Sequence, residues 1–193
     1  MGNSAQFDHN LARRLIGLRS ARGWSLDDAA EASGLSRATL SRIERGETSP
    51  TARQLGQVCA GFGLTMSRLL GGLDEHPAHH VPRADQAEWT DPETGFHRRQ
   101  VSPPAAGYAT ELIEGRLPHG ATITYDAPPL PGMEQHIWIL DGQLDFTDAE
   151  TTHRLLPGDV LRLHLWGRTR FEATGADGAH YLVVVTHAGG RNG

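Results

Sequence analysis

Apolar residues recur at helical spacing in the first third of the 193-residue chain. Leu11, Leu15 and Leu18 follow one another at i, i+4 and i+7, which is typical of an amphipathic helix. Later stretches repeat the pattern between start and stop signals such as Ser49-Pro50 and Gly63. The pattern predicts five short helices, in the stretches 11–18, 25–33, 36–46, 50–62 and 65–70.

From Glu88 onward the pattern changes to an alternation of apolar and polar residues, broken at short intervals by glycine or proline. Such alternation is typical of strands that are joined by tight turns. We expect strands at 88–90, 96–101, 108–116, 121–125, 135–140, 142–146, 153–156, 160–164, 169–173 and 181–186. About eight to ten strands in a little over 100 residues indicate a barrel or a sandwich.

The segment between the two patterns, residues 73–87, is polar and rich in proline and histidine. Its histidine spacing matches no tetrahedral metal site, so we interpret the segment as a linker. The predicted fold class is therefore α+β and multidomain. A helical domain covers residues 1–72, the linker covers 73–87, and an antiparallel β-barrel domain covers 88–193.

Charge is distributed unevenly between the two domains, although the whole chain has a formal net charge of −5. Residues 1–72 contain nine arginines and six acidic residues (+3), whereas residues 73–193 contain nine arginines and seventeen acidic residues (−8). Such an arrangement would attract nucleic acid to the helical domain alone. The single cysteine, Cys59, excludes a disulfide within the chain. Because the N-terminus lacks the apolar run of a secretory signal, we expect a cytoplasmic protein.

The stretch 36–46 is the candidate for DNA recognition. At about 100° per residue, its small and basic side chains share an arc of about 140°, opposite two large apolar side chains. The arc holds Arg37, Ala38, Ser41, Arg42 and Arg45. Ser36 suits the N-cap and Gly46 suits the C-terminal stop. A solvated helix face is the simpler interpretation of any one arginine, but a short helix of this kind can enter a major groove.

Residues 11–70 resemble the lambda-repressor-like (Xre-type) helix-turn-helix domain. The resemblance is carried by Leu18-Arg19, Gly23-Trp24-Ser25-Leu26, Gly34-Leu35-Ser36, Ile43-Glu44-Arg45-Gly46 and Ser49-Pro50. It implies DNA base contacts from Arg37, Ala38 and Arg42, and a structural ion pair between Arg19 and Glu44. Contacts with DNA phosphates, which position the domain without reading sequence, are expected from Ser25, Ser36, Thr39, Ser41 and Arg45.

The strand-rich half is similar to the cupin family in two phrases, residues 137–142 and 155–160, and the similarity extends over about residues 105–187. It implies a jelly-roll barrel. The metal-ligand positions of that family fall on Gln135, on Thr169 and within 128–131, and none of these is a strong ligand. Because a transition-metal site needs three or more converging donors, we expect no metal and no other cofactor.

The same register places Gln135, Ile137 and Ile139 inside the barrel, and His136 and Trp138 outside. A shift of one residue would turn His136 inward, so a non-standard metal site with His136 and His164 stays open. A small molecule would bind at the barrel mouth, among apolar walls with a few polar groups. The candidate effector-pocket residues are Tyr108, Glu111, Gln135, Ile137, Arg162, Thr169 and Phe171.

These features together predict a sequence-specific, DNA-binding transcriptional regulator rather than an enzyme. One helix-turn-helix unit reads only a few base pairs, so we expect a homodimer on double-stranded operator DNA. The cupin domain would supply the dimer interface and the pocket for a small-molecule effector, or would serve assembly alone. The alternative is a metal-dependent cupin enzyme of the oxygenase, epoxidase or isomerase type with a helix-turn-helix head. No association with a membrane is expected.

Overall fold

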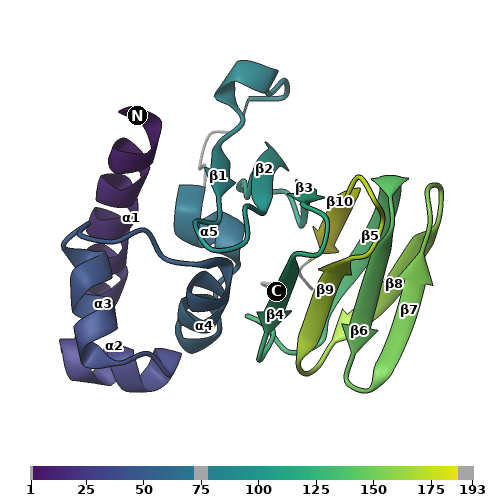
Figure 1. Cartoon of the computed structure of the whole chain (residues 1–193). Coiled ribbons are helices and arrows are strands. Elements are labelled where there is room, and N and C mark those ends of the chain that lie inside the picture. Colours follow the sequence, from purple (N-terminus) through teal and green to yellow (C-terminus); the bar gives the residue numbers. More distant parts are fainter. Residues whose placement is uncertain (1, 72–77, 187–193) are drawn as a thin grey trace, which may run out of the picture.

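The computed structural model describes residues 2–71 and 78–186, with the side chains of residues 7–71 and 78–186. Within these residues, five α-helices come first and ten β-strands follow, with the short 3-10 helix η1 (Arg83–Asp85) between them. Figure 1 shows the helices gathered on one side and the strands on the other. Residues 73–77 of the expected linker and residues 187–193 of the expected barrel domain lie outside the described residues.

The helical half matches the expectation of five helices. They are α1 (Gly2–Ala21), α2 (Leu26–Ser33), α3 (Arg37–Glu44), α4 (Ala52–Phe62) and α5 (Met66–Gly71). Ser25, Ser36 and Thr51 cap α2, α3 and α4, because each side chain accepts the backbone N–H of the residue three positions later. Gly34 ends α2 with φ of +66°, a left-handed conformation that opens the tight turn into α3.

The helices enclose an apolar core, to which α3 contributes Leu40 and Ile43 from the side opposite its arginines. Trp24 packs edge-on against Phe62 of α4, with ring centroids 5.1 Å apart. Cys59 is buried in the same core, as its place on an apolar stripe predicts. None of the described helices combines the length and the apolar composition that a bilayer span requires.

The strands form two antiparallel sheets. They are β1 (Glu88–Thr90), β2 (His97–Ser102), β3 (Thr110–Leu117), β4 (Thr122–Tyr125), β5 (Met133–Gly142), β6 (Leu144–Asp148), β7 (Thr151–Leu155), β8 (Val160–Leu165), β9 (Thr169–Ala173) and β10 (Ala179–Thr186). The larger sheet has the order β1-β2-β3-β10-β5-β8, and the smaller has the order β4-β9-β6-β7. This is the two-sheet jelly roll that the cupin resemblance implies, with β1 and β2 added to one edge.

Aromatic rings fill the space between the two sheets. Phe171 of β9 stacks on Tyr181 of β10 at 5.9 Å and meets Phe146 of β6 edge-on at 4.8 Å. Ile137 and Ile139 of β5 are fully buried and face this space. Trp138, between them, is 47% exposed on the outer face, so the strand register expected from the sequence is confirmed.

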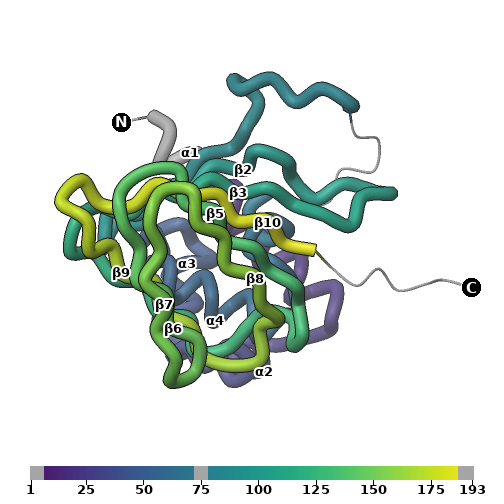
Figure 2. The backbone as a smooth tube through the Cα atoms, turned by 90° about the vertical axis from the view of Figure 1, so that its right-hand side faces the viewer, coloured from purple at the N-terminus to yellow at the C-terminus, as the bar shows by residue number. Residues whose placement is uncertain are grey.

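The helical half packs against the strands through α4 and α5, which lie between the sheets and the other helices (Figure 1). α4 contacts β4, the edge strand of the smaller sheet. Figure 2 shows the molecule turned by 90° about the vertical axis, with the strands in front and the helices behind, which agrees with this arrangement. Helix α3 is therefore left on the side of the molecule away from the sheets.

Candidate DNA-binding face and junction cavity

The outer face of α3 presents the side chains that the sequence predicts for DNA contact. Arg37, Ala38 and Arg42 are exposed, while Leu40 and Ile43 of the same helix are buried. Thr39 and Ser41 are partly exposed beside them. The side chain of Ser36 accepts the Thr39 N–H at 3.1 Å, which fixes the start of the helix. The result is a short, rigid and basic face open to a partner.

The arginines of this face differ in their partners. Arg37 forms an ion pair of 2.9 Å with Asp27, and both side chains are well exposed. Arg45 pairs with Glu47 at 2.6 Å and also donates to the Ser41 hydroxyl. Within the described residues, the side chain of Arg42 makes no hydrogen bond or ion pair, while its backbone carbonyl accepts the Glu47 N–H at 3.0 Å. Exposed pairs contribute little to stability, so a phosphate or base edge can replace Asp27 or Glu47 at small cost.

A bidentate ion pair joins the start and the end of the helix-turn-helix unit. Arg19 of α1 donates from Nε and Nη2 to the two carboxylate oxygens of Glu44, at 2.8 and 2.9 Å. It donates a third hydrogen bond, of 3.0 Å, to the backbone carbonyl of Trp24. The hydrogen bonds to Glu44 raise the pKa of Arg19. The pair that the resemblance implies is thus present, and it fixes the C-terminal end of α3 to α1.

Ser25 and Ser36, two of the expected phosphate contacts, both serve as N-caps. Ser25 forms a reciprocal capping box with Asp28, accepting the Asp28 N–H at 3.1 Å. Its hydroxyl and backbone N–H both donate to the Asp28 carboxylate, which lowers the pKa of that carboxyl. Contact between these residues and phosphate remains a prediction.

The start of α5 is held against the larger sheet by hydrogen bonds from buried side chains. Arg98 of β2 donates to the Ser67 hydroxyl at 2.6 Å, and Gln100 donates to the Ser67 carbonyl at 3.0 Å. Thr65 donates from its hydroxyl to the Glu111 carboxylate of β3 at 3.0 Å. We call these three hydrogen bonds the α5 clasp. They connect the DNA-binding half of the chain directly to the strands.

A cavity of about 130 Å³ lies at this junction, walled by both halves of the chain. The helical half contributes Gly56, Cys59, Thr65, Met66 and Ser67 to its lining. The sheets contribute mainly apolar and aromatic side chains, among them Ile123, Tyr125, Phe171, Tyr181 and Val183. The cavity therefore lies inside the mouth of the jelly roll, and α4 and α5 close that mouth.

Three polar side chains from the larger sheet line the cavity, each more than nine-tenths buried: Arg98, Glu111 and Gln135. Burial lowers the pKa of Arg98, and the nearby Glu111 carboxylate opposes that shift. The Gln135 Nε2 amide is buried without a hydrogen-bond partner in the described part of the chain. A buried donor without a partner costs about 1–3 kcal/mol, so an acceptor placed in the cavity beside Gln135 would be favoured.

Four of the seven expected pocket residues line this cavity, namely Glu111, Gln135, Thr169 and Phe171. The other three do not. Tyr108 lies in the turn before β3 and is 57% exposed. Arg162 is paired in register with His136, which places it on the outer face of β8. Ile137 points inward but is completely packed by its neighbours, so the structure does not bring these three residues together with the other four.

Sequence patterns did not indicate that α4 and α5 wall the cavity, or that Arg98 lines it. β2 reads His-Arg-Arg-Gln, polar on both faces, so its alternation does not distinguish the buried Arg98 and Gln100 from the exposed side. The residues of α4 and α5 that line the cavity follow ordinary helical patterns. Only the docking of the helical half on the strands makes them part of a cavity wall.

In this chain, the side chains at the positions where cupins bind a metal are not suited to bind one. Gln135 and Thr169 face the cavity, and neither is a carboxylate, imidazole or thiolate. His136 bonds to Glu134 at 2.7 Å and His164 pairs in register with Glu134, all on the outer face. Among the described residues, no three histidine, cysteine or acidic side chains converge as a metal site would require. The histidine pair left open by the sequence does not turn inward.

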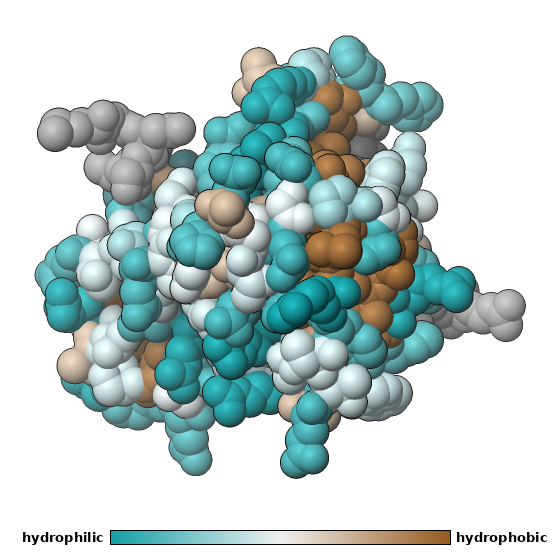
Figure 3. All heavy atoms as spheres, turned by 45° about the vertical axis from the view of Figure 1, so that its right-hand side comes forward, coloured by the Kyte–Doolittle hydropathy of each residue, from teal (hydrophilic) through white to brown (hydrophobic). Residues whose placement is uncertain are grey.

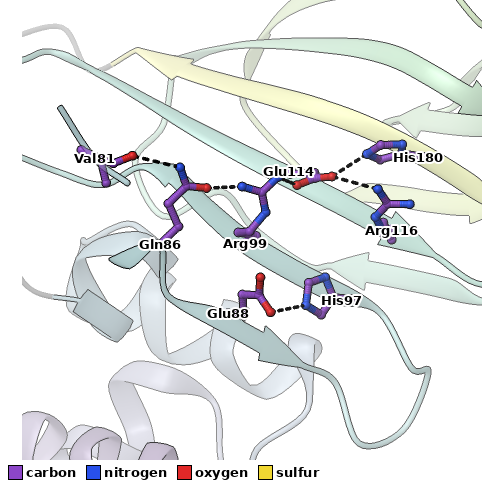
Figure 4. Close-up of polar contacts among 8 residues, drawn as sticks. All are labelled: Val81, Gln86, Glu88, His97, Arg99, Glu114, Arg116 and His180. Carbon is purple, nitrogen blue, oxygen red and sulfur yellow. Dashed lines mark hydrogen bonds and ion pairs between the residues drawn. The ribbon is translucent and has the colours of Figure 1, made fainter. Parts of the chain in front are cut away.

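A second polar network attaches the segment before β1 to the larger sheet (Figure 4). Arg99 of β2 bridges Gln86 and the buried carboxylate of Glu114, and Glu114 also bonds to His180 of β10 at 2.6 Å. Desolvation and the nearby Arg116 lower the pKa of His180. This network fixes the segment before β1 to the outer part of the larger sheet.

Comparison with known proteins identifies the helical half. A family model described as a helix-turn-helix domain matches residues 10–70. The HTH-type transcriptional regulator SutR of Escherichia coli is 30% identical over 151 residues, which cover 75% of each chain. The HTH-type transcriptional regulator DdrOP3 of Deinococcus deserti is 39% identical over 64 residues, covering 33% of this chain and 50% of that protein.

Among solved structures, an HTH_3 family transcriptional regulator from Vibrio cholerae has the same fold, with a TM-score of 0.77 and 24% identity. The superposition covers 95% of this chain and 98% of that one, so the fold of both halves is shared. The similarity to SutR extends beyond the helix-turn-helix domain into the strands. This chain belongs to the family of HTH-type transcriptional regulators.

Proposed function

We propose that this DNA-binding regulator reads a specific operator through α3, acts as a homodimer and responds to a small molecule in the junction cavity. The observation that carries the proposal is Arg42. It is exposed on the outer face of α3, between the capped start of the helix and the Arg19–Glu44 pair that fixes its end. An arginine in this position can donate two hydrogen bonds to a guanine edge.

Arg37 and Ala38 would contact neighbouring base edges from the first turn of α3. Ser25, Ser36, Thr39, Ser41 and Arg45 surround this face and would bind phosphates. Loss of a phosphate contact and loss of a base contact should affect DNA affinity in different ways. A lost phosphate contact weakens binding to every sequence about equally, whereas a lost base contact reduces the preference for the operator.

The test is the Arg42→Ala variant, titrated against the DNA upstream of the coding sequence and against scrambled DNA of equal length. We expect discrimination to fall by about 1–3 kcal/mol while binding to scrambled DNA changes little. Arg170→Ala removes an exposed arginine from β9 and serves as the matched control. Unchanged discrimination in Arg42→Ala would refute the assignment.

The homodimer would form through the outer face of the larger sheet. Figure 3, which brings the strand side forward, shows apolar side chains gathered in one patch among hydrophilic ones. Outward-facing apolar side chains on four adjacent strands are Leu112, Trp138, Val160, Leu182 and Val184. Trp138 and Val160 are 47% and 53% exposed. A large apolar area of this kind is typical of an interface, and two-fold pairing of one face gives a closed dimer.

A dimer places two α3 helices on half-sites about 34–36 Å apart, as a near-palindromic operator requires. Light scattering on the purified chain tests this arrangement. We expect a dimer for the wild type and a folded monomer with weaker operator binding for Trp138→Glu. A monomeric wild type at the concentrations that saturate the operator would exclude the dimer.

We propose that the strand domain senses a small molecule and does not catalyse a reaction. The relatives with sequence similarity are transcriptional regulators, and the cupin metal positions carry Gln135 and Thr169 instead of metal ligands. The junction cavity supports an effector pocket because its walls come from both halves of the chain. A ligand there can favour one arrangement of the DNA-binding half over another only by binding the two with different affinity.

A further inference from the structure

Two of the side chains that line the junction cavity hold donors without an acceptor in the described part of the chain. Gln135 is more than nine-tenths buried, and its Nε2 amide has no hydrogen-bond partner there. The guanidinium of Arg98 carries five N–H groups. Within residues 2–71 and 78–186, this side chain makes one hydrogen bond, to the Ser67 hydroxyl. Because an acceptor stabilises a buried donor, a ligand of this cavity should bring one.

The charges already present in the cavity favour a neutral ligand. Arg98 and Glu111 are both buried and their opposite charges interact, so the two together are neutral. Each also makes a charge-assisted hydrogen bond within the α5 clasp. An added anion or cation would leave this buried site with a net charge, which is far more costly than burial of a neutral carbonyl group. The ligand should therefore add to the existing bonds and replace none of them.

The volume and the remaining walls limit the rest of the ligand. A cavity of about 150 Å³ holds a molecule such as benzene, so the present 130 Å³ suits roughly six or seven non-hydrogen atoms. The other walls are mainly apolar, with Ile123, Phe171 and Val183 among them. Apart from its acceptor, a molecule of this size should therefore be hydrocarbon.

We propose that the junction cavity binds a small, neutral carbonyl compound with an apolar remainder, whose oxygen accepts a hydrogen bond from Gln135 Nε2 while the α5 clasp stays closed. The walls of the cavity come from both halves of the chain, so the complete site exists only while the halves are docked. The ligand would therefore hold the DNA-binding half on the strands. This inference rests on the proposed effector function of the cavity, and it names the ligand class and the direction of its effect.

The first experiment is a calorimetric titration of the full chain, without DNA, with three probes of similar size. They are cyclopentanone, methylenecyclopentane, in which a CH2 group replaces the carbonyl oxygen, and cyclobutanecarboxylate, which is an anion at neutral pH. We expect cyclopentanone to bind and the anion to bind at least about tenfold more weakly, since the anion adds a net charge to a buried site. Absence of cyclopentanone binding, or equal binding of the anion, would overturn the proposal.

The Gln135→Met variant tests the hydrogen bond to the ligand. It removes an amide donor that has no partner in the described part of the chain, so thermal stability should be unchanged or higher. The ratio of cyclopentanone affinity to methylenecyclopentane affinity should fall at least about tenfold in the variant, because the two probes have nearly the same shape and differ in the acceptor. A purely structural role of Gln135 predicts an unchanged ratio, and that result would refute the contact.

Amide hydrogen exchange tests the effect on docking. Cyclopentanone should slow exchange in α4 and in residues 64–71, by up to the factor 1 + [ligand]/Kd for exchange that requires undocking. Bound cyclopentanone with unchanged or faster exchange there would refute the proposed direction.

The outcomes separate this proposal from the proposed function on which it rests. Tight binding of methylenecyclopentane without any preference for cyclopentanone would refute the carbonyl class and leave the cavity as a small-molecule site. Binding of neither probe would overturn the proposal and count against the effector pocket as well. Since DNA is absent from all these measurements, each failure is distinct from a failure of the DNA-binding assignment, which the Arg42→Ala titration tests.

Discussion

Replacement of Gly56 by alanine should loosen the contact between the DNA-binding half and the strands. Gly56 lies in the middle of α4, where its Cα faces the ring of Tyr125 at the end of β4. A Cβ atom at this position would come within 2.5 Å of Tyr125 Cδ1 and 3.1 Å of Cε1. The Tyr125 ring packs edge-on against Phe171, with ring centroids 6.1 Å apart, so its displacement would disturb that contact or fill part of the junction cavity.

The size of the effect follows from two opposing contributions. Ordinary van der Waals contact begins near 3.4 Å, so ring and helix must separate by roughly 0.9 Å. Overpacking of this degree costs about 1–3 kcal/mol. Alanine also stabilises α4 by about 1 kcal/mol relative to glycine. This gain is present whether or not the halves are docked, so the docking equilibrium itself shifts by about 1–3 kcal/mol.

Hydrogen exchange across α4, α5 and β4 measures the shift, with thermal unfolding of the same samples. Gly17→Ala is the matched control, because Gly17 is also in a helix and its Cβ would meet nothing within 4 Å. Both variants should stabilise the helical half, but only Gly56→Ala should increase exchange at the junction. Equal exchange at the junction in the two variants would refute the reasoning, since only the contact with Tyr125 distinguishes them.

Three further predictions concern the helical half, two on Cys59 and one on Glu44. Burial raises the pKa of Cys59 from its ordinary value of about 9 to about 12, so the native thiol should resist a disulfide reagent at pH 8 until the chain unfolds. Because the unfolded chain loses this proton at lower pH, the free energy of unfolding should fall as pH rises from about 9 to 12, less steeply in Cys59→Ala. Glu44→Ala should cost about 2 kcal/mol in urea unfolding, because it leaves the Arg19 guanidinium without its bidentate partner; a loss below about 0.5 kcal/mol would mean that the pair contributes little.

Local sequence signals determined the elements and the DNA-binding face. Ser25, Ser36 and Thr51 cap helices within three residues of themselves, and Gly34 supplies the left-handed turn, so these boundaries depend on neighbours in the chain. The 3.6-residue period placed Leu40 of α3 inside and its arginines outside. Alternation in β5 likewise separated the buried and exposed side chains, because the pleat itself imposes that period.

The junction cavity depended on contacts that no local pattern encodes. Arg98 and Ser67, and Thr65 and Glu111, meet across 31 and 46 residues of chain. Strand β2 carries polar side chains on both faces, so its pattern does not show which face is buried. From the sequence, Arg162 and Tyr108 were as suitable for a pocket as Glu111 was. The sequence by itself therefore determined the helices, the strands and the face of α3, since each follows from interactions within a few residues. Only the tertiary structure decided that α4 and α5 close the mouth of the jelly roll, because docking is set by the fit of two complete surfaces.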